Sequence, residues 1–345
     1  MGHIRVIKRA TFIACALNAM LLAPSASRPA RANTGVNGPV LAIVGMRGEG
    51  GVSPNFSLVA ASSGGVTVLA RQTLNTFDGL APSPRGRYVA IAGGTSGLWE
   101  ADADGSHPRR VLSPPASPGS GAASIGAVAW SPDRFTLAYT LAGAGDAAGL
   151  YLARYDGMGR RLLATAARLG AALGPRVRDV SIGRLSWSSD GRTIAASVAS
   201  DLLPGNGYAV LLVDAATGRV RSTIRGVFDA SFSPTAPALA YLTPAPARAG
   251  RPAEGFTLTV AGATGRHPRM LISTIHFLID PVWSPDGASL AYIWDPATVE
   301  KFYEGGVEIH AIDVVTGAVR TIAAGTGPEL RGQTFIGLAW LHTRE

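Results

Sequence analysis

One block of sequence recurs along this chain at intervals of 45 to 57 residues, and this repeat constrains the fold more than any other feature. Each copy ends an apolar strand with a bulky anchor residue, and a tight turn and a second apolar strand follow. The six anchors are Pro82, Trp130, Trp187, Phe232, Trp283 and Trp340. A period of this size, with strands and turns in every unit, is typical of arrays in which one unit cannot bury its own faces.

A second turn combines Asp with Gly in four of the units, as in Asp214-Ala-Ala-Thr-Gly218 and Asp313-Val-Val-Thr-Gly317. Asp recurs there because its side chain caps the turn, and Gly recurs because it accepts a positive φ angle. The same Asp residues resemble a catalytic series. Turn chemistry explains them without catalysis, so we expect them to be structural.

Each unit contains four apparent strands, which predicts one blade of a β-propeller. The C-terminal copy, residues 334–341, supplies a single strand, and residues 40–46, 56–61 and 66–71 supply the three that it lacks. A blade built from both ends of the chain closes the ring and removes exposed sheet edges. We therefore expect an all-β, six-bladed β-propeller with ring closure by a composite blade (C-terminal strand plus N-terminal strands).

The unit that reads Trp-Ser-Pro-Asp-Gly, then Leu-Ala-Tyr, then Asp-x-x-Thr-Gly resembles the WD-type repeat of TolB-like six-bladed β-propellers. The resemblance covers about 40–345, the propeller part, and includes no counterpart of the α/β domain that precedes the propeller in TolB. These turns are specific for the fold. They say little about function, since such propellers occur in translocation proteins, peptidases and lyases.

The first 32 residues have the pattern of a signal peptide. Lys8 and Arg9 precede an apolar run over 10–23, and Ala30-Arg31-Ala32 offers a cleavage site. The run is shorter than the roughly 20 residues that a spanning helix needs, which disfavours an uncleaved anchor; lipid attachment at Cys15 is a further alternative. We expect a signal peptide over 1–32, a short linker over 33–39 and the propeller over 40–345. The protein would then be exported, periplasmic or extracellular, with no membrane span after cleavage.

The charge of the mature chain argues against nucleic acid as a partner. The formal charge is +8, but residues 1–32 hold five basic and no acidic residues, which leaves 26 basic against 23 acidic residues and a net +3. Such a mild charge, without basic runs interleaved with aromatics, is not typical of nucleic-acid binding. Cys15 is the single cysteine, so the mature chain has no disulfide and no cysteine metal site.

Long irregular segments are predicted to gather on one face of the ring. Connections between the second and third strands of a blade, and between blades, emerge around one mouth of the channel. The segments are 46–55, 142–148, 200–207, 243–255 and 294–306, with the inter-blade stretches 114–124 and 166–179. Insertions on one face of a repeat protein commonly mark its binding face, although drift in unconstrained loops is the alternative.

Charges recur three residues before the anchor, on the innermost strand of consecutive blades. Arg184, Asp229 and Asp280 stand where the other blades have small residues, and Asp78 lies one residue out of register. We expect these side chains to converge at the channel mouth as a ligand-binding site, which His276 would approach from the connection before the fifth blade. The alternative is an Asp that caps a strand and an Arg184 that pairs with a neighbour.

The segment 294–306 is chemically the most varied. Aromatic side chains beside charged ones are typical of interaction hot spots, and equally of a solvated loop pinned by one aromatic. The candidate partner-binding residues are Trp294, Glu300, Lys301, Phe302, Tyr303 and Glu304.

Enzyme motifs are weak, with no Gly-x-Ser-x-Gly turn, no His-Glu-x-x-His and no phosphate loop. We therefore expect a non-enzymatic binding module without cofactor or metal, monomeric, that recognises an envelope or extracellular protein, or a small ligand, through its loop-rich face. The alternative is a carbohydrate- or small-ligand-acting propeller enzyme such as a metal-assisted lyase, which would gather Asp229, Asp280 and His276 around a metal.

Overall fold

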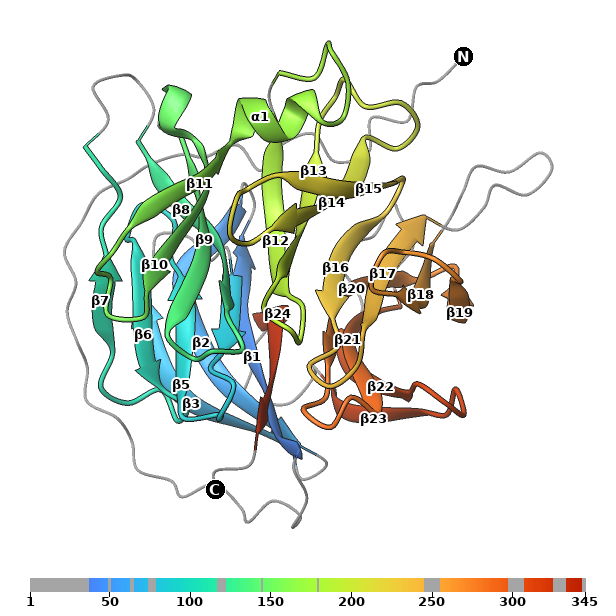
Figure 1. Ribbon diagram of the computed structural model, residues 1–345. Coiled ribbons are helices and arrows are strands. Elements are labelled where there is room, and N and C mark those ends of the chain that lie inside the picture. The colour runs from blue at the N-terminus through green and yellow to red at the C-terminus, as the bar shows by residue number, and fades with distance from the viewer. Residues whose placement is uncertain are drawn as a thin grey trace.

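The computed structural model describes residues 37–48, 51–62, 65–73, 79–116, 122–143, 145–178, 180–244, 255–296, 307–324 and 333–342. Six four-stranded antiparallel sheets form the blades of a six-bladed β-propeller (Figure 1). The predicted signal peptide over 1–32 and residues 33–36 of the predicted linker lie outside the described residues, as do Asp78 and residues 297–306. Residues 37–39 of that linker belong to the first strand of the structure. No helix within the described ranges is long and apolar enough to cross a membrane.

The blades follow the chain in order, with the innermost strand of each given first. Blade 1 contains β4 (Gly79–Pro82), β5 (Tyr88–Ala92), β6 (Leu98–Asp102) and β7 (Arg109–Leu112); blade 2 contains β8 (Ser124–Trp130), β9 (Thr136–Ala142), β10 (Gly149–Arg154) and β11 (Arg161–Thr165). Blade 3 contains β12 (Ser181–Trp187), β13 (Thr193–Ala199), β14 (Tyr208–Asp214) and β15 (Val220–Arg225); blade 4 contains β16 (Phe228–Phe232), β17 (Ala238–Pro244), β18 (Phe256–Gly262) and β19 (Arg269–Thr274). Blade 5 contains β20 (Phe277–Trp283), β21 (Ser289–Asp295), β22 (Glu308–Asp313) and β23 (Val319–Ala324); blade 6 contains β24 (Gln333–His342), β1 (Asn37–Gly48), β2 (Gly51–Ser62) and β3 (Gly65–Thr73). Between blades 2 and 3 lies the short helix α1 (Ala166–Ala171), and a 3-10 turn, η1 (Gly145–Ala147), precedes β10.

Blade 6 confirms the predicted closure from both ends of the chain. In Figure 1 the red strand β24 is the neighbour of the blue strand β1, and the two pair antiparallel with Val40 opposite Trp340. The indole N–H of Trp340 donates to the carbonyl of Gly38 at 3.0 Å. The amide of Asn37 donates to the carboxylate of Asp286 in blade 5 at 2.7 Å. The ring is therefore closed by a sheet and fastened by side chains.

The hydrophobic core lies between blades. Each of the six clusters of buried residues draws on two neighbouring blades, as where Leu185 and Trp187 of blade 3 pack with Leu150 and Leu163 of blade 2. Central strands are covered on both faces, so they are apolar without alternation, as over residues 209–213. The apolar anchors fill these seams, which explains why the sequence repeats them.

The Asp-Gly turns act as predicted. One carboxylate oxygen of Asp214 accepts from the amides of Ala216 and Thr217 at 3.0 and 2.8 Å, and Gly218 follows with a φ of +69°. Asp313 makes the corresponding bonds in blade 5. These carboxylates therefore serve their own turns.

Three predicted irregular segments are more ordered than expected. The prediction that 46–55 is an irregular segment is wrong, because β1 and β2 remain paired as far as Gly48, which lies opposite Gly51. The stretch 166–179 begins with α1, whose first turn is capped by the hydroxyl of Thr165. Trp294 belongs to β21 and not to the loop that follows it.

Candidate functional site

The residues three positions before each anchor meet at the centre of the ring. Arg184, Asp229 and Asp280, the channel trio, line a cavity of about 180 Å³. The equivalent residues of the other blades, Gly79, Ala127 and Gly337, line it too. All six blades therefore contribute to one central cavity, and its charged residues come from blades 3 to 5.

Bulges place both carboxylates of the channel trio. The pairing of β16 with β17 shifts between Phe228 and Ser231, and that of β20 with β21 shifts between Ile279 and Val282. Asp229 and Asp280 adopt positive φ angles of 48° and 56° at these shifts. A bulge redirects a side chain, and Asp is among the non-glycine residues that tolerate this conformation.

The channel trio is joined by direct contacts across the ring. Arg184 forms an ion pair with Asp280 of blade 5, two blades away, and donates to the carbonyl of Pro281 at 3.2 Å. The second carboxylate oxygen of Asp280 accepts from the amide of Leu338. Asp229 accepts from the amide of Asp280 at 3.3 Å. Arg184 thus pairs with a residue across the channel, whereas the alternative had it pair with a neighbour.

The electrostatics of the cavity are unbalanced, because two carboxylates face one guanidinium. Burial raises the pKa of Asp229, and Arg184 opposes that rise only in part. Burial also lowers the pKa of Arg184, against the attraction of Asp229. Asp280 has a partner for each oxygen, so Asp229 is the member of the trio best able to accept from a cationic or hydrogen-bond-donating group.

His276 does not join the channel trio among the residues that line the cavity. Its ring packs edge-on against Trp294, with 5.2 Å between centroids, and its Nδ1 is buried without a hydrogen-bond partner. Trp294 in turn stacks on His310 at 5.0 Å, and His310 Nε2 lies 2.6 Å from a carboxylate oxygen of Glu308. Trp294 therefore holds the end of a strand, and two histidines contact it.

The remaining predicted residues of this face lie outside the described part of the chain. These are Asp78, Glu300, Lys301, Phe302, Tyr303 and Glu304. Within the described residues, no group of three or more histidine, cysteine or acidic side chains is arranged to hold a metal ion.

A row of aromatic side chains on the loop-rich face was not among the residues predicted from the sequence. Tyr208, Phe228, Phe256 and Phe277, the aromatic arc, contact one another in turn with centroid separations of 5.1, 5.5 and 5.1 Å. They begin β14, β16, β18 and β20, the strands that follow the loop-rich connections of blades 3 to 5. An alignment of strand starts, in place of anchors, would have revealed them.

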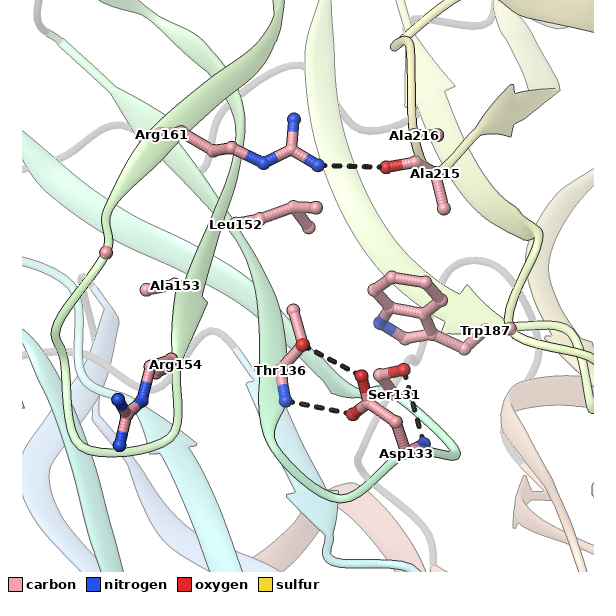
Figure 2. Close-up of a pocket in the computed structure, with 12 residues that line it drawn as sticks. Ser131, Asp133, Thr136, Leu152, Ala153, Arg154, Arg161, Trp187, Ala215 and Ala216 are labelled. Atoms are coloured by element: carbon pink, nitrogen blue, oxygen red, sulfur yellow. Dashed lines mark hydrogen bonds between the residues drawn. The ribbon is translucent and has the colours of Figure 1, made fainter.

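A larger cavity lies on the opposite side, where the Asp-Gly turns emerge. The seam between blades 2 and 3 opens into a pocket of about 350 Å³, lined by Arg161 on one side and Trp187 and Ala215 on the other (Figure 2). The sequence analysis gave no expectation for it.

Comparisons with known proteins point to propellers of one kind. No family model matches the chain. A Tol-Pal system protein TolB of Xylella fastidiosa (strain M12) is 32% identical over 89 residues, which is 26% of this chain and 18% of that protein. The TolB of Xanthomonas oryzae pv. oryzae (strain PXO99A) is 32% identical over 72 residues, 21% of this chain and 15% of the relative. The chain thus matches less than a fifth of the length of these relatives.

Solved structures share the fold over most of the chain. A putative TolB from Agrobacterium tumefaciens superposes with a TM-score of 0.57 at 15% identity, covering 88% of this chain and 98% of that one. TolB from Acinetobacter baumannii superposes with a TM-score of 0.59 at 14% identity, covering 88% and 68%. Identities this low support the fold alone.

Proposed function

We propose that this chain, a TolB-like six-bladed β-propeller, is an exported, non-enzymatic module that recognises a protein partner through the loop-rich face of blades 3 to 5. The observation that carries the proposal is the coincidence of two features on the same three blades. The channel trio supplies largely buried charge, and the aromatic arc supplies three half-buried rings and the buried ring of Phe277.

The aromatic arc suits a binding face because it is fixed before a partner arrives. Tyr208 and Phe256 start third strands, and Phe228 and Phe277 start innermost strands, so each ring is held by a sheet. Aromatic rings that are already immobilised lose little conformational entropy on association, and they dominate the hot spots of protein interfaces. Blades 3 to 5 therefore offer a firm apolar rim.

The channel trio suits recognition of a positively charged group. Asp229 faces the central cavity, where its carboxylate accepts one hydrogen bond from a backbone amide at 3.3 Å. Because Arg184 is already paired with Asp280, the negative charge of Asp229 is not fully neutralised. A lysine or arginine side chain of the partner that enters the channel mouth would balance this charge. Such a contact would give the partner orientation as well as affinity.

Trp294 gives the predicted partner-binding loop a fixed base. It is the last residue but one of β21, and its indole stacks on His310 of the neighbouring strand. In this proposal Glu300, Lys301, Phe302, Tyr303 and Glu304 contact the partner, and the periplasm or the extracellular space is the site of action. The Tol-Pal names of the relatives favour a periplasmic role.

A crosslinking pulldown tests the proposal. The mature form, residues 33–345, would be used as bait in an envelope extract, and captured proteins would be quantified by mass spectrometry. One partner should be enriched by the wild type and lost both from a variant whose residues 297–306 are replaced by a Gly-Ser linker and from Asp229→Asn.

A variant on the opposite face is the matched control. Asp313→Asn alters a turn carboxylate that lies far from the channel and should capture the partner as the wild type does. Capture that is insensitive to the loop and to Asp229, or that depends on Asp313, would contradict recognition through the loop-rich face.

A further inference from the structure

The seam pocket, between blades 2 and 3 on the turn face, lies where blade 3 has a small residue in place of the tyrosine of blade 2. Tyr155 and Ala215 hold equivalent places: each follows the third strand of its blade, and each backbone amide donates to the first turn, to Phe135 at 2.9 Å and to Arg192 at 3.0 Å. In blade 2 the ring of Tyr155 stacks on the anchor Trp130, with 6.2 Å between centroids. In blade 3 Ala215 leaves the corresponding space beside Trp187 unfilled.

The indole of Trp187 has an unmet hydrogen bond at this place. Trp187 is 9% exposed, and its Nε1 is buried without a partner among the described residues. The equivalent Nε1 of Trp283 donates to the carbonyl of Ser231 in the preceding blade at 2.8 Å. Figure 2 shows the indole of Trp187 turned toward Leu152 across the pocket. A buried N–H without an acceptor is costly. The Nε1 of Trp130, beside Tyr155, is also buried without a partner within the described part of the chain, but at Trp187 the pocket leaves room for an acceptor.

A guanidinium lies at the other side of the same pocket. Arg161 of blade 2 spans the seam and donates to the carbonyl of Ala215 at 3.2 Å (Figure 2). Its other N–H groups make no hydrogen bond to described residues. The carboxylate of Asp133 is engaged by its own turn, through the amide of Phe135 and the hydroxyl of Thr136. The pocket therefore offers free donors and a positive charge.

The remaining lining is partly polar and partly apolar. Ser131 and Arg154 are its polar residues, and Arg154 is paired with Asp156 at 2.7 Å. Leu152 and Ala153 form the blade 2 wall, and Ala215 forms the blade 3 wall. The volume of about 350 Å³ is ample for a six-membered ring, since a cavity of about 150 Å³ already holds benzene. An apolar wall with a few convergent polar groups is the usual design of a small-molecule site.

We propose that the seam pocket binds a small aromatic carboxylate. The ring occupies the space beside Trp187 that Tyr155 fills in blade 2, and the carboxylate accepts from the guanidinium of Arg161. Arg fits a carboxylate because its planar fork of donors matches the two oxygens. This site is separate from the loop-rich face, so the test of benzoate binding does not depend on whether that face binds a protein partner.

Calorimetry and thermal shift with benzoate and 4-hydroxybenzoate test the proposal, with benzyl alcohol as the uncharged analogue. Both acids should raise the melting temperature in a saturable way, and benzyl alcohol should not. Arg161→Gln should weaken benzoate binding about tenfold or more, because a charge-assisted hydrogen bond is lost. Arg269→Gln is the matched control: Arg269 makes the same seam contact, to the carbonyl of Val314, between blades 4 and 5.

Ala215→Tyr places the ring of blade 2 into the seam pocket. It should raise the melting temperature without ligand, because it fills the space, and should abolish the response to benzoate. Ala215→Val, which copies Val314 of blade 5, provides a smaller filling if tyrosine does not fit. The proposal is overturned if the wild type shows no saturable response to either acid, if benzoate binding survives in both Ala215 variants, or if Arg161→Gln binds benzoate as tightly as the wild type.

Discussion

From the contacts of the channel trio we expect substitutions of Asp229 and of Asp280 to have different effects on the free energy of unfolding. Asp280 gives one oxygen to Arg184 and the other to the amide of Leu338, and the side chains of Arg184 and Asp280 are each 18% exposed. Asp280→Asn therefore breaks a largely buried ion pair, which costs about 3–5 kcal/mol. Asp229 stays beside Arg184 and compensates in part, so we expect a loss of about 3 kcal/mol in the free energy of unfolding.

Asp229→Asn should leave stability unchanged or raise it at neutral pH. Burial raises the pKa of Asp229, so the folded state favours the neutral carboxyl, and the charged form is held at a cost. Asn removes that charge and tolerates the φ of +48° at this position. The contribution of Asp229 to stability is fully present below its unfolded pKa of about 3.9 and is lost as the pH rises through its higher folded pKa. The advantage of Asp229→Asn should therefore be absent in acid and appear as the pH rises.

Urea unfolding followed by tryptophan fluorescence measures both changes, since the chain has six tryptophans. The unfolding free energy should fall with urea concentration at the same slope in the wild type and the variants, so their unfolding midpoints can be compared directly. Equal losses for Asp229→Asn and Asp280→Asn, or a pH profile of opposite sign, would refute the assignment of Asp280 as the partner of Arg184.

Three further predictions concern the frame of the ring. Trp340→Phe removes the bond to Gly38 and part of a buried ring, so it should cost about 2 kcal/mol in urea unfolding, and a loss below about 0.5 kcal/mol would contradict the closure. Gly218→Ala should lower the free energy of unfolding by at least about 3 kcal/mol, because the added Cβ would collide with the carbonyl of Leu163. In the matching turn the Cβ of Gly317→Ala meets no other atom among the described residues, so this variant should lose only about 1–2 kcal/mol, the penalty for a positive φ angle. Bonds from the amides of Thr217 and Thr316 lower the pKa of Asp214 and Asp313, so their stabilisation should be present above pH ~4 and fade as the pH falls through the lowered values; a stability that is flat from pH 5 to pH 2 would disprove this.

Features set by local chemistry could be predicted from the sequence. The anchors and the Asp-Gly turns fix the register of each blade, and that register in turn correctly placed Arg184, Asp229 and Asp280 around one cavity. The composite blade followed because the terminal copies were complementary. Repetition made the alignment of the blades firm, since the anchor recurs six times along the chain.

Features that depend on the path of a connecting segment, or on a side chain that one blade lacks, could not be predicted. His276 packs on Trp294 because the chain between β19 and β20 bends that way, and no pattern records the bend. The ion pair across the channel needs two bulges at Asp229 and Asp280, which a periodic alignment treats as ordinary strand. The seam pocket is the space left by a tyrosine that blade 3 lacks, and an absent ring leaves no motif.

The pairing of β24 with β1 has a consequence for how the protein is made. The ribosome delivers β1 first among the strands, yet its inner partner emerges only after five blades have been synthesised. Until then β1 has a bare backbone edge, which can recruit a strand from another nascent chain. Overproduced protein should therefore be most vulnerable to strand pairing between molecules just before translation reaches residue 333. Faster translation late in the message, or a chaperone that shields β1, should increase the yield of properly assembled rings.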